Sequence, residues 1–222
     1  MSRKRVAKVR IGLFGASGMI GQRVTLEALV RGHEVKSLAH HPGGPITHPR
    51  LTEAQVDIFD PASILEAIAE TDVVVNATSG RKSLDTHAFY IDSTQALIEA
   101  FGRAGEKRLI VVGGAGSLEV TPGLFLKDSP DFPAVARPTA NAQAETLVMY
   151  RAAPITWTFF CPSRTIQTGR RTGKYRRGGD QLLTNDLGES YISVEDYAFA
   201  LLDEIEQPQA VRQRFTAVSL EK

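Results

Sequence analysis

The stretch Val9-Arg10-Ile11-Gly12-Leu13-Phe14-Gly15-Ala16-Ser17-Gly18-Met19-Ile20-Gly21-Gln22 predicts how the fold begins. Apolar residues lead into three evenly spaced glycines, Gly15, Gly18 and Gly21, and an amphipathic stretch follows from Val24. This order predicts a strand, a tight turn and a helix. In such a unit the first glycine permits the turn, the second lets backbone N–H groups approach a pyrophosphate, and the third lets the helix pack closely. Because the helix N-terminus carries partial positive charge, we expect a dinucleotide cradle here.

The second predicted strand, residues 34–39, ends without the acidic residue that takes the ribose 2′-hydroxyl of NAD. It runs instead into His40 and His41. No anion there repels a 2′-phosphate, either histidine could donate to it, and Lys36 or Arg23 could add positive charge. We therefore expect NADPH to be preferred, with NADH as the alternative. Two exposed loop histidines without a role are the competing interpretation.

Composition and charge are those of an ordinary globular chain. It has 222 residues, 42% of them hydrophobic, and a net charge of +1, so nothing indicates nucleic-acid or membrane binding. The single cysteine, Cys161, excludes an internal disulfide and fits a cytoplasmic protein. The basic segment 2–5 precedes no long apolar run, and we expect a solvated arm. His40, His41 and His48 lack a cysteine or carboxylate set, so we expect no metal site.

The remainder of the chain alternates between strand and helix patterns. The predicted strands after residue 50 are 55–58, 72–76, 108–112 and 155–160. The predicted helices between them are 61–70, 86–104 and 138–152. Asp60 and Ser193 are placed to cap helices. This order predicts one α/β domain over residues 1–222, a Rossmann-type doubly wound parallel sheet with helices on both faces. Residues 162–192 form its small C-terminal, substrate-side loop region.

Ligands bind beyond the carboxyl ends of the strands in such sheets, and this rule selects the candidate site. The residues that we expect to hold the cofactor are Gly15, Ser17, Gly18, Met19, Ile20, Gly21, His40, His41, Asp57, Ile58, Asn76, Ala77, Thr78, Gly113, Gly114 and Pro162. Asp57 could accept from the adenine amino group. Four of these residues also have a purely structural interpretation. Asn76 could be a loop cap, Gly113 and Gly114 could be turn formers, and Asp57 could be a solvated acid.

Several motifs resemble one known family. They are residues 15–21 (GASGMIG), 111–120 (VVGGAGSLEV), 169–175 (GRRTGKY), 188–198 (GESYISVEDYA) and 214–216 (RFT). Together they are similar to the NAD(P)H-binding atypical short-chain dehydrogenases that are often labelled NADH-flavin reductases, relatives of biliverdin reductase B. The resemblance extends over residues 8–217. It implies a Rossmann fold, a reduced nicotinamide cofactor, and reduction of flavins or quinones.

One departure from the wider superfamily bears on mechanism. Short-chain dehydrogenases that reduce carbonyls use Tyr-x-x-x-Lys, in which the lysine lowers the tyrosine pKa so that the phenol can protonate the nascent alkoxide. The corresponding helix, residues 137–145, has no such pair, and Tyr150 is not followed by a lysine four residues on. The usual serine position falls near Gly113 or Gly114. Hydride transfer to a conjugated ring needs less protein chemistry, so the absence favours a flavin or quinone over a ketone.

The candidate substrate side combines one serine and a basic loop. Ser117 is the candidate catalytic residue, able to hydrogen-bond an acceptor carbonyl, although a turn role is the alternative. The candidate substrate-binding residues are Ser163, Arg164, Arg170, Arg171 and Tyr175. With Lys174, Arg176 and Arg177 the arginines could form one wall that attracts an anionic acceptor such as FMN; a solvated loop surface is the alternative.

These observations predict an NAD(P)H-dependent reductase that transfers hydride to a flavin, a quinone or a similar small conjugated acceptor. Two alternatives stay open. One is a regulator that senses the dinucleotide without turning it over, and the other is an isomerase, epimerase or specialised biosynthetic reductase on the same scaffold. The sequence does not indicate an oligomeric state.

Overall fold

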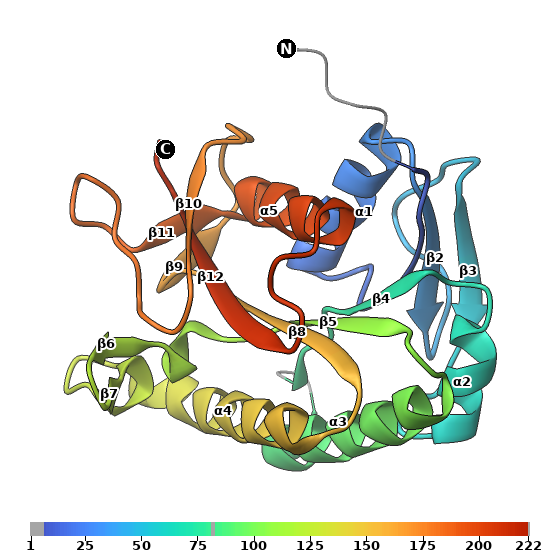
Figure 1. The fold of residues 1–222 in the computed structure, drawn as a ribbon, viewed down its shortest axis with the longest axis horizontal. Coiled ribbons are helices and arrows are strands. Elements are labelled where there is room, and N and C mark those ends of the chain that lie inside the picture. Colours follow the sequence, from blue (N-terminus) through green and yellow to red (C-terminus); the bar gives the residue numbers. More distant parts are fainter. Residues whose placement is uncertain (1–6, 81–82, 222) are drawn as a thin grey trace.

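A central eight-stranded sheet has the strand order β10-β12-β8-β5-β4-β1-β2-β3 (Figure 1). The computed structural model describes residues 7–80 and 83–221. The strands of this sheet are β1 (Arg10–Phe14), β2 (Glu34–Ala39), β3 (Leu51–Gln55), β4 (Val73–Asn76), β5 (Arg108–Val112), β8 (Thr156–Cys161), β10 (Tyr175–Gly178) and β12 (Gln213–Ser219). Neighbouring strands pair in parallel, except that β10 runs antiparallel to β12. The chain order reverses between β1 and β4, where ligands of doubly wound sheets bind.

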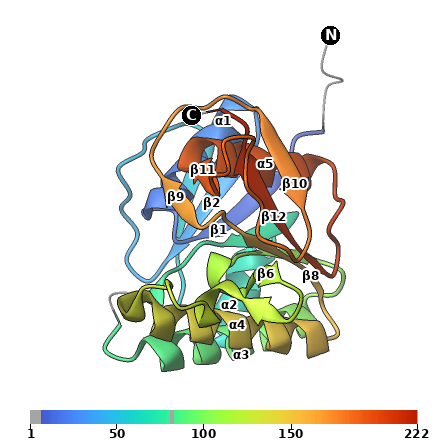
Figure 2. The same ribbon diagram turned by 90° about the vertical axis from the view of Figure 1, so that its left-hand side faces the viewer.

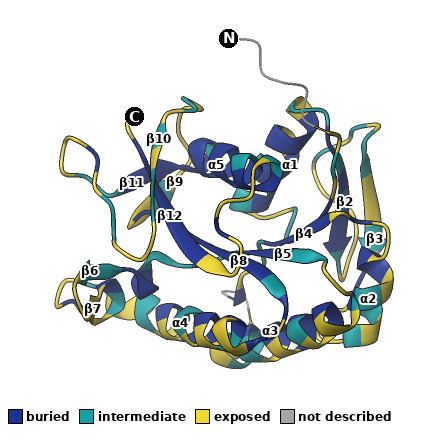
Figure 3. Cartoon of the chain, in the orientation of Figure 1, coloured by how far each residue is buried: buried dark blue, intermediate teal, exposed yellow. Residues whose placement is uncertain are grey.

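Helices cover both faces of the sheet (Figures 1 and 2). One layer holds α1 (Met19–Val30) and α5 (Val194–Glu206), and the other holds α2 (Pro61–Ile68), α3 (Thr86–Arg103) and α4 (Arg137–Ala152). The alternation of strand side chains builds a core on each side: in β1, Ile11 and Leu13 join the α1–α5 core, and Phe14 joins the other. Figure 3 shows the resulting pattern, with the central strands and the inner faces of the helices buried and the outer strand β3 largely exposed.

The predicted Rossmann-type fold is confirmed. Strand β2 spans the predicted residues, and the first helix begins directly after the glycine loop. The predicted caps form: Asp60 Oδ1 accepts the amide of Ala62 at 2.9 Å, and Ser193 Oγ accepts the amide of Asp196 at 2.9 Å. The prediction of a third strand over 55–58 is wrong. Strand β3 ends at Gln55, and Asp57 lies in the following turn.

The sequence did not predict the strands after β8 or the short segments between β5 and α4. The smaller pairs are β6 (Glu119–Thr121) with β7 (Leu124–Phe125), antiparallel, and β9 (Thr165–Gln167) with β11 (Tyr191–Ser193), parallel. The 3-10 turns are η2 (Ala115–Ser117), η3 (Leu126–Asp128) and η4 (Ala134–Ala136). The basic segment 2–5 lies outside the described residues. Within residues 7–80 and 83–221, no helix is both long and apolar enough to cross a membrane.

Candidate functional site

The glycine loop after β1 is packed so tightly that two of its positions exclude a side chain. Gly15 has φ +77°, and a Cβ there would lie 2.5 Å from the carbonyl oxygen of Ala77. A Cβ on Gly21 would lie 2.0 Å from the Gly15 carbonyl oxygen. At Gly18 the same test gives 3.3 Å to Gly15 O and no other contact within 4 Å. Gly15 and Gly21 are therefore required by the packing of the turn. Gly18 lies on the side of the turn that faces away from this packing, where a larger side chain would occupy space available to a ligand.

The N-terminus of α1 is free to receive an anion. Gly18 is the N-cap residue and supplies no side-chain acceptor, and the first turn contains no acidic residue. Within residues 7–80 and 83–221, no carboxylate bonds the first-turn amides of α1, which are therefore presented to an anion. Met19, the first helical residue, is 48% exposed, and Ser17 is held through its carbonyl by the side-chain amide of Gln22 at 2.7 Å. This cradle fits a dinucleotide pyrophosphate.

The two histidines after β2 contact each other. His40 Nδ1 lies 3.0 Å from His41 Nε2, and their rings are perpendicular with centroids 4.4 Å apart. Both are exposed and follow β2 at the carboxyl edge of the sheet, beside the glycine loop. One ring nitrogen of each residue is left for another partner, so the pair could meet a phosphate as well as solvent.

The loops after β3 and β4 are folded by their own side chains. Asp57 Oδ1 accepts the amide of Phe59 at 2.9 Å, and Ile58 packs partly buried against the α2–α4 core. After β4, Asn76 Oδ1 accepts both the amide and the hydroxyl of Thr78, at 3.1 and 2.7 Å. These contacts are the turn and cap roles considered as alternatives. Both loops follow the carboxyl ends of their strands, at the same edge of the sheet as the glycine loop.

The loops after β5 and β8 meet beside α4. A Cβ on Gly113 would lie 2.1 Å from the Phe159 ring, so this glycine is required by packing. Ser117 is 5% exposed; its hydroxyl donates to the carbonyl of Gly114 at 3.2 Å and lies 3.6 Å from Cys161 Sγ. This geometry favours the turn role of Ser117, and its catalytic role stays a prediction. Pro162 continues β8 at the same edge.

Two residues with potentially reactive side chains, Cys161 and Tyr150, are buried. Cys161 is fully buried, and burial raises the pKa of its thiol to about 11. Tyr150 lies in the core between Trp157 and Phe159, and burial raises the pKa of its phenol well above the ordinary value. Neither group can supply a proton or a nucleophile to a ligand at the sheet edge.

A single basic wall stays a prediction, and the ion pairs of these residues give it no support. Five of the six basic side chains pair with different carboxylates: Arg164 with Asp131, Arg171 with Glu27, Lys174 with Glu221, Arg176 with Asp186 and Arg177 with Glu204. Arg176 and Arg177 are neighbours in β10, so their side chains point to opposite faces of the sheet. Ser163 is also turned inward, with its hydroxyl donating to the Ala217 carbonyl at 2.8 Å.

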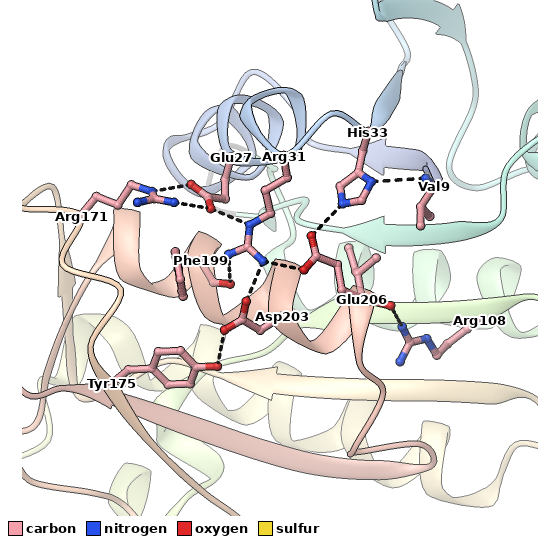
Figure 4. A network of polar contacts seen from close by, with 11 residues as sticks. Val9, Glu27, Arg31, His33, Arg108, Arg171, Tyr175, Phe199, Asp203 and Glu206 are labelled. Carbon is pink, nitrogen blue, oxygen red and sulfur yellow. Dashed lines mark hydrogen bonds and ion pairs between the residues drawn. The ribbon is translucent and has the colours of Figure 1, made fainter. Parts of the chain in front are cut away.

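Arg171 and Tyr175 belong to a polar network on the α1–α5 side of the sheet (Figure 4). Arg171 binds Glu27 through two hydrogen bonds of 2.7 and 2.8 Å, and Glu27 also accepts from Arg31 at 2.7 Å. Tyr175 donates to Asp203 at 2.9 Å, and Asp203 also pairs with Arg31. These contacts give both residues a structural role, so their proposed contact with substrate has no support in this geometry. The Arg170 side chain is exposed nearby.

The acidic residues at the start of α5 do more than cap the helix. Asp196 is fully buried and accepts the amides of Thr172 and Gly173, each at 2.8 Å. Glu195 accepts the amide of Gly169 at 2.8 Å and pairs with Arg23 of α1 at 2.9 Å. The two carboxylates thereby fasten residues 169–173 to both helices. Sequence reasoning assigned only the helix-terminal role, because the partners are about 25 or more residues away.

A cavity of about 240 Å³ lies at the opposite edge of the sheet, near the amino ends of β1, β2 and β3. Its lining includes Arg10, Lys36, Arg50 and Glu70. Lys36 lines this cavity at the amino ends of the strands, and its charge contribution to a 2′-phosphate stays a prediction.

A parallel sheet with its switch point between β1 and β4, a glycine turn and an uncapped helix N-terminus define a dinucleotide-binding Rossmann protein. The family model described as NAD(P)H-binding matches residues 15–208. The chain belongs to this family.

Solved structures agree with this assignment. A protein from Burkholderia pseudomallei, provisionally named an exported protein, is 41% identical, with a TM-score of 0.85 and coverage of 95% of this chain and 99% of its own. A protein from Bacteroides thetaiotaomicron, provisionally named an epimerase, is 35% identical, with a TM-score of 0.87 and coverage of 97% and 99%. A protein from Streptococcus pneumoniae, provisionally named an NADH-flavin reductase, is 30% identical, with a TM-score of 0.85 and coverage of 95% and 99%.

Proposed function

We propose that this protein is an NAD(P)H-dependent reductase that transfers hydride to a flavin, a quinone or a similar planar conjugated acceptor, with NADPH as the preferred cofactor. The observation that carries the proposal is the glycine cradle at the uncapped N-terminus of α1, together with the absence of Tyr-x-x-x-Lys in α4. The name of the Streptococcus pneumoniae neighbour supports the acceptor class.

The residues have separable roles in this proposal. Gly15, Gly18 and Gly21 hold the pyrophosphate against the helix amides. His40 and His41 take the 2′-phosphate, since no carboxylate follows β2 to repel it. The bound cofactor supplies a hydride, which is two electrons and a proton equivalent. The protein orients the reactants.

The acceptor lies, in this proposal, beside the loops that follow β4, β5 and β8. A conjugated ring spreads the charge that arrives with the hydride, so the protein need not stabilise a localised alkoxide. A free thiol or a lysine is not required. The network in Figure 4 does not take part, because its carboxylates and guanidinium groups satisfy one another.

The test is oxidation of NADPH by the purified protein, followed by absorbance, against a panel of FMN, quinones and simple ketones. Steady oxidation with FMN or a quinone supports the proposal, and the Gly18→Val variant serves as a control that lacks the cradle. Turnover of ketones alone would contradict it. Conversion of a sugar substrate without net consumption of cofactor would instead favour an epimerase, the activity suggested by the name of the Bacteroides thetaiotaomicron neighbour.

A further inference from the structure

A tyrosine from outside the usual helix lies beside the loop after β5. Tyr90 is in the second turn of α3 and is 9% exposed. The side-chain amide of Gln143, from α4, donates to the Tyr90 hydroxyl oxygen at 3.4 Å. Sequence spacing could not reveal this pair, because its members are separated by 53 residues.

Gln143 also lies directly against Gly114. A Cβ on Gly114 would lie 2.1 Å from Gln143 Oε1, so no side chain fits at Gly114 while Gln143 holds this position. The usual serine of carbonyl reductases is expected near Gly113 or Gly114. The amide of Gln143 occupies the space beside Gly114 and connects the β5 loop to Tyr90.

The start of α3 is fixed against the loop after β4, which gives Tyr90 a defined place. The Thr86 hydroxyl donates to the Gly80 carbonyl at 3.2 Å, and a Cβ on Gly80 would lie 2.9 Å from the Phe89 ring. Phe89 in turn meets Tyr90 edge to face, with centroids 5.8 Å apart. Tyr90 is thereby linked to the loop after β4 through Phe89 and to the loop after β5 through Gln143.

The direction of the hydrogen bond leaves the proton of Tyr90 available. Its oxygen accepts from Gln143, so its own O–H can donate to a third group. An N–H aimed at the phenol oxygen also stabilises negative charge that develops there when the proton leaves. The four other tyrosines do not compete: Tyr150 and Tyr197 are fully buried, Tyr175 is bound to Asp203, and the Tyr191 hydroxyl lies against the Gly169 backbone.

We propose that Tyr90 donates the hydrogen bond to the acceptor oxygen and supplies its proton, and that Gln143 positions Tyr90. This inference rests on the proposed reductase function. The Tyr90 O–H bond breaks as an O–H bond forms on the acceptor, while the electron pair arrives as the hydride of the reduced nicotinamide. A proton from water then restores the phenol, and Gln143 keeps its own protons throughout.

The experiment compares Tyr90→Phe and Gln143→Leu with Tyr150→Phe, which removes a phenol hydroxyl from the core. A quinone accepted by the wild-type protein is the substrate. We expect Tyr90→Phe to lower kcat at least about tenfold, with loss of the solvent isotope effect, and Gln143→Leu to lower kcat less. Tyr150→Phe and the NADPH affinity of all variants should stay within about twofold of wild type.

A binding measurement separates this inference from the proposed function. With NADP⁺ present, calorimetry with a quinone should show about three- to tenfold weaker binding for Tyr90→Phe and no change for Tyr150→Phe, because one hydrogen bond is lost. Unchanged quinone affinity, or an unchanged isotope effect, in a folded Tyr90→Phe protein would overturn the role of Tyr90. Lack of turnover by the wild-type protein with every flavin and quinone would overturn the proposed function, whatever the binding result.

Discussion

Two glycines of the same loop should respond to substitution in opposite ways. Gly21→Ala places a methyl carbon 2.0 Å from Gly15 O and 2.8 Å from Ala16 Cα, and both neighbours are backbone. Relief requires α1 to move away from β1, which we expect to cost about 1–3 kcal/mol. A domain of this size loses about 2–4 °C of melting temperature per kcal/mol, so Tm should fall by roughly 2–12 °C.

Gly18→Val should destabilise the fold less than Gly21→Ala and abolish most cofactor binding. The Gly18 backbone is extended, with φ −75° and ψ 168°, and the added Cβ meets only Gly15 O, at 3.3 Å. The rest of the side chain then occupies the open side of the turn. Loss of even one charge-assisted hydrogen bond to a phosphate, about 1.5–3 kcal/mol, weakens NADPH binding roughly 10- to 150-fold.

The assay is thermal unfolding together with calorimetric titration of NADPH for each variant. Gly102→Ala is the matched control, because a Cβ there meets nothing within 4 Å and α3 should gain up to about 1 kcal/mol of helix propensity. Unchanged NADPH affinity in Gly18→Val would show that the cradle is misplaced. A Gly21→Ala protein as stable as wild type would refute the packing argument.

Three further predictions follow from the contacts described above. Replacing His40 and His41 by alanine should reduce the preference for NADPH over NADH while leaving NADH affinity intact; equal losses for both cofactors in a titration would remove the histidines from 2′-phosphate recognition. Cys161, with its pKa raised to about 11, should react with a disulfide reagent at about pH 8 at least roughly a hundredfold more slowly in the folded protein than in urea, and rapid labelling would contradict its burial. Burial raises the pKa of the Glu27 carboxyl, but hydrogen bonds from Arg171 and Arg31 outweigh burial and lower this pKa below 4.5. The ionised carboxylate therefore stabilises the folded protein above that pH, and this stabilisation is lost as the pH falls through the folded-state pKa. Glu27→Gln should cost roughly 1–3 kcal/mol near neutral pH and progressively less in acid, as measured by urea unfolding, and a pH-independent difference would disprove the linkage.

The fold was predictable because its signals are local. The period-two or continuous apolar runs of β1, β4, β5 and β8, and caps such as Asp60, are visible within a few residues of chain. The glycine loop was predictable for the same reason. The last two strands of the sheet were not, because β10 reads Tyr-Arg-Arg-Gly, a charged sequence that becomes a strand only by pairing with β12.

The sequence predicted the part of the candidate site that backbone atoms form, the glycine loop. It did not predict the parts that depend on which side chains pair with one another. The basic loop resembled a binding wall in sequence, yet its arginines are distributed among distant acids such as Glu27 and Asp131. Arg171 and Glu27 are 144 positions apart and Arg164 and Asp131 are 33 apart, and pairs at such separations produce no periodic pattern in the sequence. The same applies to Tyr90 and Gln143, which adjacent helices bring together.

The antiparallel strand β10 has a consequence for solubility. The outer strand of a sheet presents unpaired backbone groups that a second molecule could extend into a shared sheet. Here that border is only four residues long, so an approaching copy would meet few hydrogen-bonding positions. At the other border, β3 exposes Thr52, Glu53 and Gln55. The polar chemistry of these two outer strands should discourage aggregation through the sheet edges at high protein concentration.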